Sequence, residues 1–218
     1  MSVYPNESFQ EPLKRKDSPE RLVFFTDAVV AIALTLLVLP LTDIVPGLVA
    51  DHGHSIQAFT EHTWQIRSFL LSFLVIGRQW MSHRRLFAQV IGYTNELFML
   101  NLLWLLTVVV MPFPTQMVGA FGTDKFTCLF YIGTMLANSL CLTALVAKVR
   151  GNPELTGDPD AISDSWWIDS VGATVSLAVA LLLAAFVPGV SYFAILLLLA
   201  PGIAARLSRS GKGVGRTS

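Results

Sequence analysis

The chain has 218 residues, of which 53% are hydrophobic and 14% are charged, and its formal net charge at pH 7 is zero. Soluble globular domains carry about 25% charged residues, so this depletion points away from a soluble protein. The zero net charge argues against a general nucleic-acid-binding surface, and we expect no nucleic-acid partner. Long apolar runs recur along the sequence, which is typical of a helical membrane protein.

Six apolar segments are long enough to cross a bilayer, because a helix rises about 1.5 Å per residue and the hydrocarbon core is about 30 Å thick. The second segment has the weakest pattern, since Arg67 and Arg78 flank its apolar centre. The sequence therefore predicts an all-α membrane protein with six transmembrane helices per protomer. The predicted transmembrane segments are 22–41, 66–83, 97–118, 126–147, 168–187 and 190–206.

Basic residues fall mainly on one side of this topology. Thirteen of the 15 Lys and Arg residues lie on the side that holds both termini, and only Arg67 and Lys125 lie on the other. Cytoplasmic loops of membrane proteins carry the excess of Lys and Arg. We therefore expect a multi-pass protein of the cell membrane, surrounded by lipids, with both termini in the cytoplasm. Its expected parts are a cytoplasmic segment 1–20, a transmembrane domain 21–207 and a basic cytoplasmic tail 208–218.

The first segment, from Arg21 to Leu41, carries polar groups that a simple anchor does not need. At about 100° per residue, one stripe of this helix holds Arg21, Phe25, Ile32, Leu36 and Leu39, with Thr35 on its shoulder. Thr26 and Asp27 point away from that stripe, toward the flanking helices. The apolar stripe is open to two interpretations: a face packed on a neighbour or on lipid, or a pore lining narrowed by aliphatic side chains. Periodicity alone does not separate them.

A charged Asp27 inside the membrane needs a partner, because an unpaired charge there is costly. The second segment ends with Trp80 and His83, which are three residues apart and so lie on one helix face. We expect a contact between Asp27 and His83 toward the cytoplasmic side, with Trp80 and Arg21 near it. By itself, His83 is equally well explained as a histidine at the membrane interface.

Three other patterns predict local structure or a site. The sequence Met111-Pro112-Phe113-Pro114 predicts a break in the third segment, since proline lacks an amide donor. Ser163 or Asp164 is expected to cap the fifth helix. The loop sequence Asp51-His52-Gly53-His54 has metal-ligand residue types, but a solvated loop explains it more simply, and we expect no metal site.

The sequence contains no GxSxG, no HExxH and no glycine-rich loop in a strand–helix setting. Such motifs hold the nucleophiles, metal ligands and phosphate cradles of common enzyme classes. We therefore expect no catalytic residues, no cofactor and no enzymatic activity.

The pattern Arg21-xxx-Phe25-Thr26-Asp27, with Ile32 and Thr35 following, resembles the Arg-xxx-Phe-Ser-Asp signature of the transmembrane protein 175 family. That family comprises endolysosomal potassium channels and their prokaryotic relatives. The stretches 72–87 and 101–115 are similar to its second and third helices, and the resemblance covers about residues 20–120. The chain departs from the family at two positions: threonine replaces serine at Thr26, and Arg84 stands where relatives often have a second histidine.

The resemblance implies a prokaryotic homotetramer in which the first helix lines one central pore. Ile32, Leu36 and Leu39 would form hydrophobic constrictions, and Thr35 a polar layer that bears on potassium selectivity. The residues implied to brace the pore helix through hydrogen bonds are Arg21, Thr26, Asp27, Trp80 and His83.

The expected function is therefore a potassium-permeable cation channel, with potassium as the permeant ion and not a resident cofactor. The sequence has no TVGYG-type carbonyl filter, so selectivity must arise by another route, and we expect it to be modest in a chain with a single repeat. Two alternatives remain at this point. One is a proton-coupled secondary ion transporter that uses Asp27 and His83 as a relay; the other is a membrane scaffold without transport.

Overall fold

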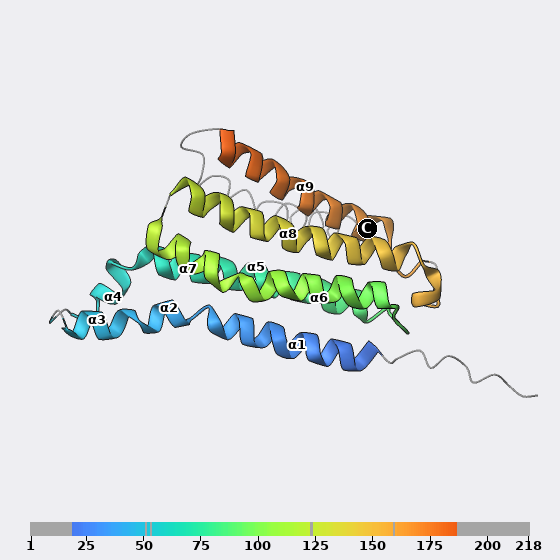
Figure 1. Cartoon of the computed structure of the whole chain (residues 1–218), viewed down its shortest axis with the longest axis horizontal. Helices are drawn as coiled ribbons and strands as arrows, with labels where there is room; N and C mark the ends of the chain where they lie inside the picture. Colours follow the sequence, from blue (N-terminus) through green and yellow to red (C-terminus); the bar gives the residue numbers. More distant parts are fainter. Residues whose placement is uncertain (1–18, 51, 53, 123, 159, 187–218) are drawn as a thin grey trace, which may run out of the picture.

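The structure is a computed structural model that describes residues 19–50, 52, 54–122, 124–158 and 160–186. In these residues the chain is helical and contains no strand. Figure 1 shows the long helices running side by side, with α1 along one edge of the bundle and α9 along the other. The helices are α1 Pro19–Leu36, α2 Leu39–Thr42, α3 Ile44–Ala50, α4 Gln57–Thr60, α5 Thr63–Phe87, α6 Asn95–Val110, α7 Pro112–Phe121, α8 Lys125–Arg150 and α9 Asp164–Phe186, with a 3-10 turn at Pro153–Leu155.

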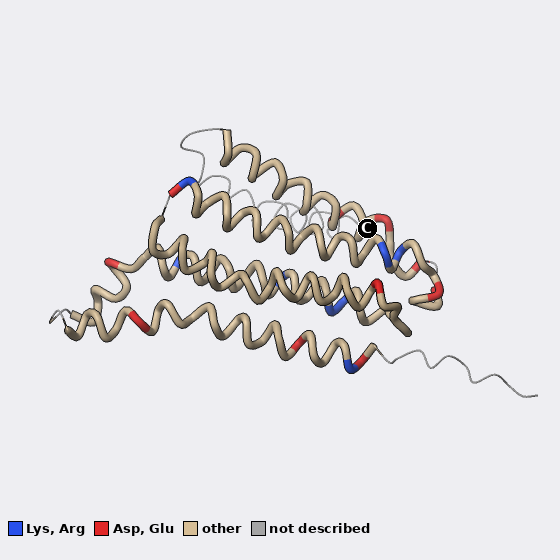
Figure 2. Tube along the Cα trace, in the orientation of Figure 1, with Lys and Arg blue, Asp and Glu red and all other residues tan. Residues whose placement is uncertain are grey.

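Four helical stretches in the described residues are long and apolar enough to span a membrane, which confirms the all-α membrane class. They are Pro19–Ala50, Asn95–Phe121, Lys125–Arg150 and Asp164–Phe186. The predicted segment 66–83 is helical within α5, but that helix is not among the four. The predicted segment 190–206 and the tail 208–218 lie outside the described residues. Figure 2 shows most charged residues near the ends of the long helices.

The predicted span 22–41 lies within the apolar stretch Pro19–Ala50, but its helix is interrupted near the end. Helix α1 ends at Leu36, and α2 begins at Leu39. Pro40 has no N–H to donate to the carbonyl of Leu36, the position four residues earlier. The turn is closed by tighter bonds, from Val38 N to Thr35 O at 3.3 Å and from Leu41 N to Val38 O at 2.9 Å.

The predicted break in the third segment is confirmed. Helix α6 ends at Val110, and α7 begins at Pro112, at its first position, where proline is tolerated. The caps follow the sequence as well. Thr94 accepts a hydrogen bond from Leu97 N at the start of α6, and Ser163 accepts one from Trp166 N at the start of α9, which settles the predicted choice between Ser163 and Asp164.

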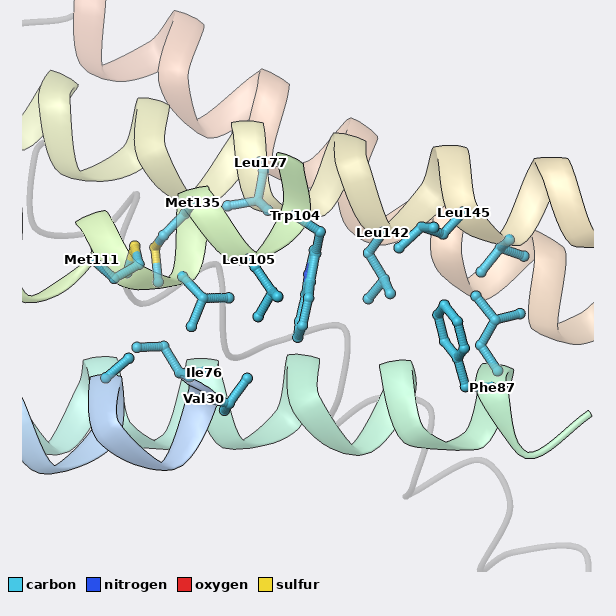
Figure 3. Close-up of a cluster of buried hydrophobic side chains, with 14 of the residues drawn as sticks. Val30, Ile76, Phe87, Trp104, Leu105, Met111, Met135, Leu142, Leu145 and Leu177 are labelled. Atoms are coloured by element: carbon cyan, nitrogen blue, oxygen red, sulfur yellow. The ribbon is translucent and has the colours of Figure 1, made fainter. Parts of the chain in front are cut away.

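The core lies between α1, α5, α6, α8 and α9. Figure 3 shows Trp104 reaching from α6 toward α5, between Leu105 and Leu142, with Val30 and Ile76 close by. Trp104 is fully buried. Because lipid tails are as apolar as leucine, such burial holds helices together through close packing, and buried polar pairs add specific bonds between them.

Two groups of hydroxyls join the helices through such bonds. On the α8–α9 interface, Thr143 lies 2.8 Å from Ser170 and 2.9 Å from Thr174, and Ser139 lies 2.8 Å from Thr174, all oxygen to oxygen. We call these four residues the hydroxyl ladder. The second group joins α5, α7 and α8, where Ser72 Oγ lies 2.8 Å from Thr115 Oγ1 and 2.9 Å from the Tyr131 hydroxyl.

Candidate functional site

Helix α1 has two different faces. The face toward the other helices is buried at Leu22, Thr26, Val30 and Ala33. The opposite face is uncovered in the protomer. The exposed fractions on this face are Phe25 53%, Ile32 59% and Leu36 39%, and Leu39, which begins α2 beyond the break, is 51% exposed. The predicted stripe therefore lies on an apolar surface that this single chain does not cover.

Thr35 lies on the exposed side of α1, next to this stripe. Its hydroxyl donates a hydrogen bond to the carbonyl of Ile32, with 2.7 Å between the oxygens. A hydroxyl that uses its hydrogen in this way keeps its lone pairs as acceptors. Thr35 can thus offer an oxygen to a cation at the surface of α1.

Asp27 is held by two groups of α5. The Trp80 Nε1–H donates to Asp27 Oδ1 at 2.6 Å, and Arg84 Nε lies 3.8 Å from Asp27 Oδ2. The Arg84 guanidinium also lies over the Trp80 ring, 5.3 Å from its centroid. The carboxylate on α1 is therefore fixed to one turn of α5.

A second connection is a buried chain of side chains through α1, α6 and α5. Asn101 donates from Nδ2 to Thr26 Oγ1 at 3.0 Å, which leaves its Oδ1 to accept from His83 Nε2 at 2.6 Å. This order assigns the Nε2–H tautomer to His83, since an amide oxygen can only accept. The His83 ring is stacked between Phe87 and Trp104, with centroids 4.4 and 4.3 Å away.

The predicted direct contact between Asp27 and His83 is wrong. In the described part of the chain the two residues share no hydrogen bond or ion pair: Asp27 bonds to Trp80, and His83 bonds to Asn101. Arg21 is exposed and forms no ion pair with Asp27 among the described residues. The orientation predicted for Thr26 and Asp27, away from the apolar stripe, is confirmed by their bonds.

Sequence reasoning missed two members of these networks, Asn101 and Arg84. The signal for Asn101 was an amide inside an apolar segment, which must find a partner. The signal for Arg84 was its spacing of four residues from Trp80, which places both on one side of α5.

The loop that carried metal-ligand residue types is only partly described, because Asp51 and Gly53 lie outside the described residues. Across the residues that the structure does describe, no group of three or more His, Cys, Asp or Glu side chains is placed to hold a metal ion.

Comparison with known proteins gives consistent matches. The family model "Endosomal/lysosomal potassium channel TMEM175" matches residues 21–112. A potassium channel of Streptomyces collinus is 36% identical over 132 residues, which are 57% of this chain and 61% of that protein. The endosomal/lysosomal proton channel TMEM175 of Danio rerio is 24% identical over 158 residues, 72% of this chain and 30% of that protein. The matched part of the chain thus spans about three fifths of the bacterial relative.

The fold also matches a solved structure. The crystal structure of a lysosomal potassium-selective channel TMEM175 homolog from Chamaesiphon minutus aligns with a TM-score of 0.69 at 23% identity, over 85% of this chain and 96% of that one. The likeness in fold therefore extends well beyond residue 112, where the family match ends.

Proposed function

The chain belongs to the TMEM175 family in its prokaryotic form, and on that premise we propose that it forms a potassium-permeable cation channel in the cell membrane. Four protomers surround one pore lined by α1, within a six-helix transmembrane domain 21–207, and both termini lie in the cytoplasm. The observation that carries this proposal is the exposed apolar stripe on the helix whose opposite face is fixed by polar bonds. We propose no cofactor, no resident metal and no catalysis.

The stripe supports a pore lining because of what holds the helix behind it. A helix that only faces lipid has no need of a carboxylate bonded to Trp80 and a buried Asn101 chain. These bonds fix the rotation of α1 about its axis. The same rotation would turn Ile32 and Leu36 of each protomer toward a common axis, and we place Leu39, at the start of α2, next to them along that axis.

Selectivity in this proposal comes from the cost of removing water from the ion. Aliphatic side chains at Ile32, Leu36 and Leu39 cannot replace a lost hydration shell, so a narrow ring of them penalises the more strongly hydrated sodium ion more than potassium. The Thr35 oxygen, which remains free to accept, adds a partial substitute for water between two of these rings. The expected selectivity is modest.

The test is cation flux from liposomes that contain the purified protein. Ile32→Asn replaces the aliphatic ring with amides, so we expect a higher conductance and a lower preference for potassium over sodium. The matched control is Val179→Asn, a valine that is 43% exposed on α9 and remote from α1. An unchanged potassium-to-sodium ratio in Ile32→Asn would contradict the proposed constriction.

The same assay separates the rival functions. The transporter hypothesis requires a proton relay between Asp27 and His83. In the structure these two residues have different hydrogen-bond partners, Trp80 and Asn101. Uptake that requires a proton gradient and saturates with ion concentration would support the transporter. The absence of any flux from well-folded protein would support a scaffold.

A further inference from the structure

We propose that the outer face of α5 holds an anionic phospholipid, whose phosphate lies between Arg78 and Arg85. The two arginines are seven residues apart, so they lie on the same helix face, about 10 Å apart along the axis. Both are exposed. The opposite face of α5 is buried at Ser72, Ile76 and His83.

In the part of the chain that the structure describes, neither arginine has a carboxylate partner. The ion pairs there include Arg84 with Asp27, Lys148 with Glu96, and Arg150 with Asp164. Arg84 neighbours Arg85 in sequence, but it lies about 100° around the helix and is engaged with Asp27 and Trp80. At this end of α5, the charge without a carboxylate partner among the described residues therefore lies on the face that carries Arg78 and Arg85.

Arg78 lies about two turns inside the end of α5, at the level of apolar surface. An unpaired guanidinium at that depth is unfavourable, and long arginine side chains relieve the cost by extending toward the headgroup layer. Extension in that direction brings the Arg78 guanidinium toward Arg85. Two guanidinium groups brought together in this way would suit the oxygens of a phosphate, which each can bind with two hydrogen bonds.

The surface below the arginines suits a lipid tail. Leu70, Leu74 and Met81 share the exposed side of α5, with exposed fractions of 52%, 61% and 48%. A ligand that fits this face has an anionic head and a long apolar tail, which describes an anionic phospholipid. Arg85 lies in the last turn of α5, Lys148 and Arg150 lie in the last turn of α8, and Arg21 lies near the start of α1. The expected topology puts all of them, and Arg78, on the side of the leaflet that attracts basic residues.

The experiment measures lipid binding and not ion flux, so it stands or fails apart from the channel proposal. Purified full-length protein is titrated with phosphatidylglycerol or with phosphatidylcholine of the same acyl chains, and bound lipid is counted by native mass spectrometry. Wild type is expected to retain phosphatidylglycerol preferentially. Arg78→Gln/Arg85→Gln is expected to lose affinity for phosphatidylglycerol on the order of tenfold, with phosphatidylcholine unchanged.

The matched control is Arg67→Gln, which removes an exposed arginine from the other end of α5 and should bind phosphatidylglycerol like wild type. A second variant, Arg78→Lys/Arg85→Lys, keeps both charges but removes the planar forks, and should show a smaller loss. It also preserves the test if the glutamine variant does not fold.

Three results would overturn the proposal. The first is equal phosphatidylglycerol binding by wild type and Arg78→Gln/Arg85→Gln. The second is displacement of the lipid by inorganic phosphate alone at millimolar concentration, which would show a simple anion site that makes no use of the tail. The third is dissociation of the assembly in the lysine variant, which would show that a second copy of the chain covers this face.

Discussion

Asp27 on α1 and Trp80 on α5 are 53 residues apart in sequence, yet the indole nitrogen of Trp80 lies 2.6 Å from a carboxylate oxygen of Asp27. This bond joins the exposed helix to the rest of the bundle near one end. A second bond, from Asn101 to Thr26, joins the neighbouring position of α1 to α6. Two adjacent residues of α1 are thus attached to two different helices, which resists both rotation and sliding of α1.

The Asp27–Trp80 bond is expected to be coupled energetically. Asp27→Ala and Trp80→Phe should each lower the unfolding midpoint in detergent, and the double variant should lose less than the sum of the two. Hydrogen bonds to charged groups contribute about 1.5 to 3 kcal/mol, so we expect a coupling energy of about 1 kcal/mol for this partly exposed pair. Trp166→Phe, in the first turn of α9 and away from Asp27, is the control and should have little effect. Fully additive losses would show that the bond contributes nothing.

Asn101→Ala is expected to cost more than either of those changes. Asn101 is fully buried, and the substitution leaves both Thr26 and His83 without a partner. Leaving buried polar groups unpaired should lower the free energy of unfolding by roughly 3 kcal/mol, seen as a large drop in thermal midpoint or in the yield of monodisperse protein.

The control for Asn101→Ala is Asn152→Ala. That amide is exposed and donates to the Lys148 carbonyl at 2.7 Å, so its loss should change stability only slightly. Similar losses of stability in the two variants would mean that the buried hydrogen bonds of Asn101 stabilise the protein no more than the exposed bond of Asn152.

Thr35→Val should lower the preference for potassium over sodium without changing assembly, if the channel proposal is correct. Valine keeps the shape of threonine but removes the acceptor oxygen. Thr42→Val is the matched control, because Thr42 is also exposed and bonds back to the carbonyl three residues earlier, but it lies beyond the break after α1. Ion-ratio measurements on liposomes check both variants. Equal effects at the two positions would remove the special role of Thr35.

Tyr131→Phe tests the hydroxyl cluster between α5, α7 and α8. The substitution removes one hydrogen bond to Ser72, while Ser72 keeps its bond to Thr115. A loss of about 1 kcal/mol in unfolding free energy is expected, because no buried group is left without a partner. Tyr93→Phe provides the comparison, since it removes a hydroxyl from a half-buried tyrosine at the end of the bundle. A loss of unfolding free energy well above that of a single hydrogen bond would indicate that the Ser72–Thr115 bond is lost as well.

Sequence reasoning predicted the helices with uninterrupted apolar segments and clear caps. Helix α8 follows Asp124, whose side chain accepts from Thr127 N, and α9 follows Ser163. The break before Pro112 was predictable for the same kind of reason, because proline acts on the backbone locally. Pro40 acts in the same way, but it lies one residue before the predicted end of its segment. At that place a proline is expected at the end of a helix, so it did not indicate a break inside the segment.

The partners of the polar side chains could not be predicted to the same degree. The helical angle showed that Asp27 points toward a neighbouring helix, but Trp80 and His83 lie on nearly the same face of that helix. Which of them meets Asp27 depends on the rotation and height of α5 against α1. The packing of the whole bundle sets both the rotation and the height. The residue that bonds to His83 is Asn101, from a third helix, and not Asp27 as predicted.

The hydroxyl ladder between α8 and α9 has a consequence for how this half of the chain can change in evolution. Its hydroxyls can each donate or accept, so serine and threonine can replace one another and the direction of each bond can reverse while the helices stay paired. Selection on such an interface acts on residue size and type more than on a fixed order of letters. Homologous chains can therefore drift apart in sequence here while keeping their shape, in keeping with a family match that ends at residue 112 and a fold match over 85% of the chain.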